Sequence, residues 1–252
     1  MTTNNYKQLV TELKKYNETS NTEIYVPSLN KTISFKPLTV KQQTDIITGV
    51  LNAQKSKNLY DYQNIVDSII IANCDESSIN SVLALDRACI LIQFRLDTIG
   101  ETVEIEGQTY SLTEHVATFK DKPIDIGSIS NVCEHKGITA TCTVPTLQQE
   151  TKINADTSGI FKDGTTERAV GKVFLIELAK HIQHISFDKN EIDFTQLSIK
   201  QQIQICEMLP MTLSQQIIKY IETVRALEEQ FVKISTPDGL VSIPIDSQLF
   251  NK

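Results

Sequence analysis

The segment from Ser81 to Glu101 (SVLALDRACILIQFRLDTIGE) constrains the fold of this chain more than any other. From Leu85 to Leu96 it is apolar almost all round, and its polar positions are Asp86, Arg87, Gln93 and Arg95. A helix with apolar side chains on most of its circumference has to be surrounded by neighbours. The sequence therefore predicts a central core helix whose buried side chains are Leu85, Cys89, Leu91, Ile92, Phe94, Leu96 and Ile99.

Composition excludes several classes of protein. The chain has 252 residues, of which 40% are hydrophobic, so it can bury a sizeable core. Its net charge of -7 disfavours a protein that coats nucleic acid. It contains no apolar run near the roughly 18 residues that cross a bilayer, and its first residues are too polar for a signal peptide. Five scattered cysteines are typical of reduced thiols, so we expect synthesis in the host cytoplasm and neither nucleic acid nor membrane as a partner.

The first half of the chain alternates between helical and strand-like patterns. The expected elements, in order, are an arm or short helix over Tyr6–Tyr16, a β-hairpin around Asn30, helices over Thr39–Ala53 and Leu59–Asn73, the core helix, a hairpin turning at Glu106-Gly107, a short helix over Ser111–Phe119 and a hairpin turning near Lys136-Gly137.

The second half is mostly helical in pattern. Residues 154–166 are the most loop-like stretch and our predicted internal boundary. A helix is expected from Glu167 to about His184, then a small hairpin over residues 186–194, and two helices over Ser198–Leu209 and Thr212–Val232. Four capping boxes mark helix starts, at the pairs Thr39/Gln42, Ser111/Glu114, Ser198/Gln201 and Thr212/Gln215.

These elements predict an α+β fold that is helix-dominated with small antiparallel β-hairpins. The expected organisation is an N-terminal arm or short helix (1–21), an α+β core with hairpins (22–153), a helical C-terminal region (154–234) and an extended tail (235–252).

One candidate metal site lies on the third hairpin. Cys133, His135 and Cys142 would share one face if the turn is at Lys136-Gly137. A structural zinc site requires four ligands, usually in closely spaced pairs, and these three residues lack that spacing. Small buried cysteines on the core face are the simpler interpretation.

Other candidate sites have no better support. His181 and His184 would share a helix face, but the carboxylate of a metalloprotease helix does not stand between them. Asp188, Glu191 and Asp193 lack the spacing of a calcium loop. We therefore predict no catalytic, cofactor-binding or metal-binding residues, and a protein that is not an enzyme.

Arg87 and Arg95 stand on the apolar core helix. A buried guanidinium needs a partner, and Asp86 or Glu101 could provide the carboxylate. We expect structural ion pairs here.

The last predicted helix has apolar residues spaced 4, 3, 4, 3 and 4, which is heptad spacing: Leu213, Ile217, Tyr220, Val224, Leu227 and Phe231. Such a stripe can pack on the chain's own helices or on a partner. The tail that follows has a Pro-Asp-Gly turn, a short apolar strand (Leu240–Ile245) and two large apolar side chains, Leu249 and Phe250. Packing on the chain's own helices is the favoured interpretation of the stripe. We expect the tail to pack on a partner beside it, so that both would belong to a possible partner interface; docking of the tail back on its own chain is the alternative.

Four segments, in this order, resemble the baseplate hub subunits of contractile-tailed, T-even-like bacteriophages. They are EIYVPSLNKTISFKPLTVKQQ, LDRACILIQFRLDTIGE, NVCEHKGITATCTVPTL and EMLPMTLSQQIIKYIETVRALEE, which together span most of the chain from Glu23 to Glu229. Each is a structural motif, so the resemblance depends on their order and spacing.

The resemblance implies a structural component of the central hub of a phage tail baseplate, located in the virion and active in tail assembly. Its partners would be other baseplate hub, tail tube or tape-measure proteins, with self-association as a further possibility, and no cofactor is implied. Two alternatives remain: a tail-assembly chaperone that is absent from the mature virion, and a non-catalytic cytosolic binding module.

Overall fold

The computed structural model describes residues 2–56, 59–74, 76–157, 166–188, 190–237, 239–245 and 247–250. The α-helices in chain order are α1 (Thr2–Thr19), α2 (Val40–Ser56), α3 (Leu59–Asn73), α4 (Glu76–Ile79), α5 (Arg87–Thr98), α6 (Leu112–Ala117), α7 (Leu147–Thr157), α8 (Thr166–His181), α9 (Ile199–Met208) and α10 (Met211–Val232).

The strands form small antiparallel sheets. They are β1 (Thr22–Val26), β2 (Lys31–Phe35), β3 (Thr102–Ile105), β4 (Gln108–Ser111), β5 (Val132–His135), β6 (Ile138–Cys142), β7 (Ile182–Phe187), β8 (Asn190–Asp193), β9 (Lys233–Thr236) and β10 (Gly239–Ser242). Three sheets are two-stranded hairpins, β1–β2, β3–β4 and β9–β10, and the fourth has the strand order β5-β6-β7-β8. The predicted helix-dominated α+β class is confirmed.

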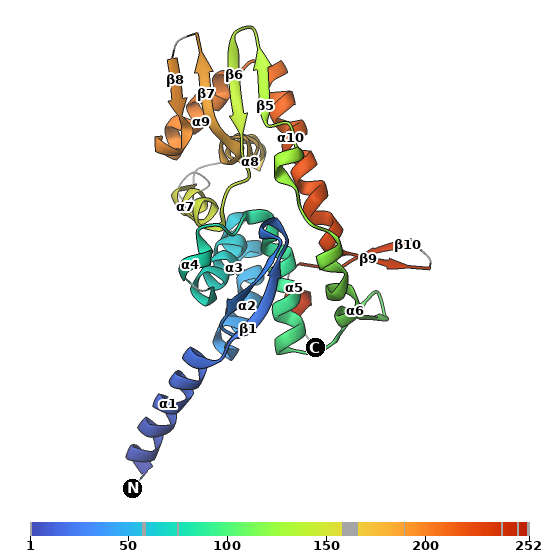
Figure 1. Cartoon of the computed structure of the whole chain (residues 1–252). Helices are drawn as coiled ribbons and strands as arrows, with labels where there is room; N and C mark the ends of the chain where they lie inside the picture. The colour runs from blue at the N-terminus through green and yellow to red at the C-terminus, as the bar shows by residue number, and fades with distance from the viewer. Residues whose placement is uncertain are drawn as a thin grey trace.

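The elements are arranged around α5 and α10 (Figure 1). The lower body in this view contains α5 with β1–β2, α2, α3, α4 and α6 around it, while the four-stranded sheet and α9 form the upper part. Helix α10 runs along one side from the sheet to the lower body and continues directly into β9. Two elements project from the body, namely α1 at one end and the β9–β10 hairpin at the side.

Helix α5 lies in the centre of the core, as its apolar circumference predicts. Cys89, Leu91, Ile92 and Phe94 are completely buried and Leu85, just before the helix, is nearly so. Leu96 and Ile99 lie at the end of this segment and are partly buried against the same core. Burying this many apolar side chains provides most of the driving force for folding.

Two of the predicted capping boxes form completely. Thr39 and Gln42 exchange hydrogen bonds between side chain and backbone at the start of α2, with Thr39 N donating to Gln42 Oε1 over 2.9 Å. Ser198 and Gln201 do the same at the start of α9. At α6, Ser111 Oγ accepts a hydrogen bond from Glu114 N. These starts could be predicted because a capping box is a purely local motif.

The fourth capping box is wrong. Helix α10 begins at Met211 after Pro210, which is its N-cap residue, so Thr212 lies inside the first turn. A capping box that the sequence analysis missed, Thr146 with Gln149, begins α7: Thr146 N donates to Gln149 Oε1 over 2.9 Å, and Gln149 N donates to Thr146 Oγ1.

The predicted hairpin turns are confirmed. Glu106-Gly107 and Lys136-Gly137 each have two consecutive positive φ angles, 53° and 77° in the first pair and 47° and 81° in the second. That backbone matches the twist of the strands on either side of a two-residue hairpin loop. The register of both hairpins therefore follows directly from the sequence.

The predicted boundary after residue 153 is not a break in the structure. Helix α7 continues through it to Thr157, and Asn154 is completely buried. The predicted loop is therefore helical in its first part, while residues 158–165 lie outside the described residues. In addition, β7 and β8 of the C-terminal region pair with β5 and β6 of the core region in one sheet. The two regions share secondary structure and core.

Helix α8 ends at His181, earlier than predicted, and the chain enters β7 at once. His184 therefore stands on a strand, so the expected pair of histidines on one helix face does not exist. The β-branched residues Ile182 and Ile185 are both buried in β7, and sheet pairing with β6 decides their conformation.

The C-terminal tail docks on its own chain. Strand β10 pairs with β9, and the short helix η6 (Ser247–Phe250) packs against α2 and α5. Leu249 and Phe250 are completely or almost completely buried there, and Gln43 Nε2 donates to the carbonyl of Phe250 over 3.2 Å. These two side chains are thus part of the core, which corrects the prediction that they form a partner interface.

Candidate functional site

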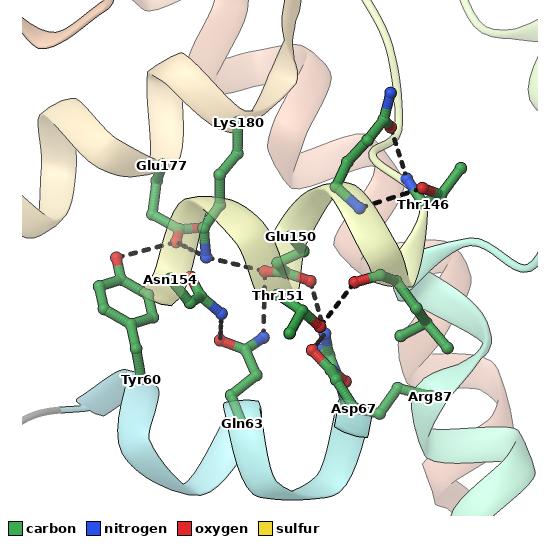
Figure 2. Close-up of polar contacts among 12 residues, drawn as sticks. Tyr60, Gln63, Asp67, Arg87, Thr146, Glu150, Thr151, Asn154, Glu177 and Lys180 are labelled. Atoms are coloured by element: carbon green, nitrogen blue, oxygen red, sulfur yellow. Dashed lines mark hydrogen bonds and ion pairs between the residues drawn. The ribbon is translucent and has the colours of Figure 1, made fainter. Parts of the chain in front are cut away.

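A buried charged cluster centred on Glu150 joins α3, α5, α7 and α8 (Figure 2). Arg87, at the start of α5, makes a two-pronged contact with Asp67 of α3, in which Nε lies 2.5 Å and Nη2 3.0 Å from the carboxylate oxygens. The same Nη2 lies 2.5 Å from Glu150 Oε2. Asp67 is completely buried, and the Glu150 side chain is 6% exposed. One guanidinium therefore holds carboxylates from two other helices.

Lys180 connects the cluster to α8. Its ammonium lies 2.8 Å from Glu150 Oε1 and 3.1 Å from Glu177 Oε1, and its side chain is almost completely buried. It also lies 4.2 Å from the centre of the Tyr60 ring, a cation–π distance. Tyr60 donates its hydroxyl to Glu177 over 3.1 Å, as Figure 2 shows.

Polar side chains and α10 complete the cluster. Gln63 Nε2 donates to Glu150 Oε1 over 3.1 Å, and Asn154 Nδ2 donates to Gln63 Oε1 over 3.4 Å. On the outer side, Arg225 of α10 donates to Glu177 over 3.1 Å. The cluster therefore includes side chains from five helices.

The electrostatics of the cluster keep Glu150 charged. Burial alone raises the pKa of a carboxyl group, but Arg87 and Lys180 outweigh burial and lower the pKa of Glu150 to about 2. Burial, against the opposing effect of Arg87, raises the pKa of the neighbouring Glu228 to about 6. Burial likewise raises the pKa of Asp67, so Glu150 is the carboxyl group beside the Arg87 guanidinium whose pKa falls, because it has two cations in direct contact.

Stability should therefore fall in acid through Glu150. The pKa of Glu150 in the folded protein lies below its ordinary value of 4.5. Its contribution to the free energy of unfolding is therefore complete above about pH 4.5 and is lost as the pH falls towards about 2. The loss is on the order of 3 kcal/mol. In a Glu228→Gln variant, the free energy of unfolding measured with urea should still fall by this amount in acid, because the pKa of Glu228 is shifted in the opposite direction. In a Glu150→Gln variant, the free energy of unfolding should depend less on pH over this range. An equal pH dependence in both variants would contradict this assignment.

A cavity of about 140 Å³ lies beside the cluster, with Arg87, Glu150, Glu177, His181 and Glu228 in its wall. Arg87, Glu150 and Glu177 are engaged in ion pairs, and burial lowers the pKa of His181, which favours the neutral imidazole. What this arrangement does is to fix the positions of α3, α5, α7, α8 and α10 by mutual attraction. Removing one member would leave a buried charge without its partner.

The cluster corrects the predicted partners of the two arginines. Arg87 pairs with Asp67 and Glu150, which are 20 and 63 residues away in sequence. Arg95 donates to the carbonyls of Gly100 and Thr102, over 2.8 and 2.7 Å. Neither arginine pairs with Asp86 or Glu101, the two carboxylates that the sequence analysis expected. Asp86 instead accepts hydrogen bonds from Ser28 and from Leu83 N.

Glu150 could have been noticed in the sequence. It stands on the inward face of α7 with Leu147, Asn154 and Thr157, all of them buried. An acidic residue three positions from a core leucine and four from a buried asparagine indicates a paired carboxylate.

The remaining candidate residues do not come together into a larger site. Cys133 and Cys142 are buried with their sulfur atoms 3.9 Å apart, and burial raises the pKa of both thiols. His184 lies 3.9 Å from Glu191 on the exposed side of the sheet. In the described ranges, no three His, Cys, Asp or Glu side chains form a group that could hold a metal ion.

The heptad stripe of α10 packs on the chain itself. Five of its side chains are buried, namely Leu213, Ile217, Tyr220, Val224 and Phe231, and Leu227 is half-buried. Helix α10 contacts α5, α8, β5 and β6 along this stripe. The stripe therefore packs on the chain's own elements. In this position α10 buries apolar side chains of the core helix and of the sheet.

Among the described residues, an apolar stripe on α1 is left open. Tyr6, Leu9, Leu13 and Tyr16 are spaced 3, 4 and 3, and each is more than half exposed, from 54% to 68%. We call these four residues the α1 stripe. The sequence analysis treated this segment as an arm or docked helix; Figure 1 shows that the helix projects from the body.

Comparisons with known proteins identify the family. The family model described as "T4 bacteriophage base plate protein" matches residues 18–236, which include the core helix, the charged cluster and the four-stranded sheet. No curated protein and no solved structure matches the chain. None of the helices among the described residues is long and apolar enough to cross a membrane. The resemblance to phage baseplate proteins is thus confirmed, and the chain belongs to the T4 bacteriophage base plate protein family.

Proposed function

We propose that this baseplate protein is a subunit of the central hub of a contractile tail and acts in tail assembly through contacts with other hub, tail tube or tape-measure proteins. Family membership supports a place in the virion tail and contacts with other baseplate or tail proteins. The charged cluster supports a structural role, since its groups hold the chain's own helices together. In this proposal the protein has no catalytic role and needs no cofactor.

The single observation that carries an assembly role is the α1 stripe. A helix of 18 residues that stands alone in water is only marginally stable. Four large apolar side chains on one face of such a helix are typical of a helix that packs against a partner. Because α1 lies away from the core, this partner has to come from outside the body that Figure 1 shows.

A double variant tests this role. Leu9→Glu with Leu13→Glu places two charges in the middle of the α1 stripe, where a packed partner would have to desolvate them. We expect production of infectious particles, measured by complementing a phage that lacks this gene, to fall by about tenfold or more. Thermal unfolding of the purified variant should match that of the unmodified protein, because these side chains are not part of the core.

The matched control adds the same charge to the opposite face. Gln8→Glu with Thr11→Glu alters two exposed residues of the same helix outside the stripe, and particle yield should stay unchanged. Wild-type yield from the stripe variant would contradict the proposal. Mass spectrometry of purified tails separates the hub from the chaperone alternative, since a chaperone would be missing from the finished particle.

A further inference from the structure

A groove runs between two hairpins on the side of the lower body. It has a volume of about 630 Å³ and is lined by all four residues of β4 and all four of β9, together with residues at the start of α6. Within the described part of the chain, neither β3 nor β10 contributes to its wall. The β4 edge that is turned away from β3 and the β9 edge that is turned away from β10 therefore both border the groove.

The pairing pattern shows which backbone groups these edges present. Leu112 N donates to the carbonyl of Glu101 over 2.7 Å, so the alternate pair Val103↔Tyr110 is also hydrogen-bonded. Thr109, which precedes Tyr110 on β4, belongs to the non-hydrogen-bonded pair Glu104↔Thr109 and so directs its N–H and C=O away from β3. Thr109 is exposed, and the described residues provide no backbone partner for it.

Strand β9 has the same arrangement. Ile243 N donates to the carbonyl of Val232 over 2.7 Å, and the alternate pair Ile234↔Val241 is hydrogen-bonded in turn. Ser235 is exposed and directs its N–H and C=O away from β10, again without a backbone partner among the described residues. Two strand edges with free donors and acceptors thus border one groove, which is the geometry that accepts an added strand.

The charge of the groove indicates what kind of strand it suits. Its wall contains two lysines, Lys122 and Lys233, and one carboxylate, Glu114. Lys233 is paired with Glu229, whereas Lys122 donates to the backbone carbonyl of Gln230 over 3.2 Å and has no carboxylate partner in the ranges described. When Lys233 is counted with its partner Glu229, the charges of Lys122 and Glu114 sum to zero, and Lys122 is the ammonium group of the wall that has no carboxylate in direct contact among the described residues.

We propose that this groove binds an extended segment of another polypeptide, which pairs through its backbone with the free edges of β4 and β9 and places a carboxylate near Lys122. Backbone pairing would provide the affinity, and the lysine would select acidic segments. This binding mode goes beyond the proposed hub role, which depends on α1, and it can be tested on the purified full-length protein without any tail assembly.

The probe is a synthetic nine-residue peptide of alternating threonine and valine with a central glutamate. We expect NMR titration to shift the amide resonances of Thr109 and Ser235 in a saturable way. Thr109→Pro and Ser235→Pro each remove an outward N–H that the hairpins themselves do not use, so the folds of β3–β4 and β9–β10 should persist. Peptide affinity should fall by about tenfold in either variant.

Two controls make the result specific. Leu240→Pro removes the corresponding outward N–H on the far edge of the β9–β10 hairpin, outside the groove, and should leave peptide affinity unchanged. A peptide with glutamine in place of glutamate should bind more weakly to the unmodified protein but equally to a Lys122→Gln variant. Shifts that avoid Thr109 and Ser235, or equal binding to the proline variants, would overturn the proposal, and the α1 experiment would be unaffected.

Discussion

Ile92→Asp should remove a large part of the protein's stability. Ile92 is completely buried in the middle of α5, and its neighbours Leu91 and Phe94 are completely buried as well. An aspartate there would place a charge among apolar side chains with no cation to pair with, at a cost on the order of 3 to 5 kcal/mol. Since a domain of this kind is stable by only about 5 to 15 kcal/mol, we expect either insoluble expression or a thermal transition at a much lower temperature.

The conservative change at the same position is the control. Ile92→Val removes one buried methyl group and should lower the free energy of unfolding by about 1 kcal/mol while keeping a cooperative transition. A soluble Ile92→Asp protein that unfolds at the same temperature as the unmodified chain would show that α5 is not the centre of the core.

Glu150→Gln should have the second-largest effect. The change keeps the shape of the side chain but removes the negative charge that lies between Arg87 and Lys180. Arg87 and Lys180 would then each lose a carboxylate partner. The loss matters most for Lys180, because its side chain is almost completely buried. Breaking a buried ion pair from one side costs about 3 to 5 kcal/mol, so we expect that loss in the free energy of urea unfolding at pH 7.

A surface ion pair provides the comparison. Glu229 of α10 pairs with Lys233, the first residue of β9, and the Glu229 side chain is 56% exposed. Glu229→Gln should change stability by less than about 1 kcal/mol, because water already solvates both charges. The cost of Glu150→Gln should also shrink towards pH 2, where Glu150 of the unmodified protein takes up its own proton. Equal costs for the two variants would contradict the importance of the buried cluster.

Local motifs made much of the fold predictable. The hairpin turns and the complete capping boxes at Thr39 and Ser198 depend on residues within a few positions of each other, and all of them formed as expected. The core helix was predictable because its apolar circumference leaves burial as the only stable arrangement. Membership of the baseplate family also followed from the order of segments along the sequence.

Pairing over long distances in the chain was not predictable. Arg87 was expected to pair with a nearby carboxylate, but its partners are Asp67 and Glu150, which folding brings together from other helices. The segment around His184 has helical apolar spacing, yet pairing with β6 makes it a strand. Phe250 was expected at an interface and is buried beside α2. In each case, the deciding contact comes from residues that no local pattern connects.

The direct continuation of α10 into β9 has a mechanical consequence. Val232 ends the helix and Lys233 begins the strand, so no loop separates the β9–β10 hairpin from a helix of 22 residues that is about 33 Å long. At its other end the same helix packs against β5 and β6. A force on the projecting hairpin would therefore tilt α10 as a stiff lever and be felt at the four-stranded sheet. Load applied at one side of the molecule thus reaches the far end through a single helix.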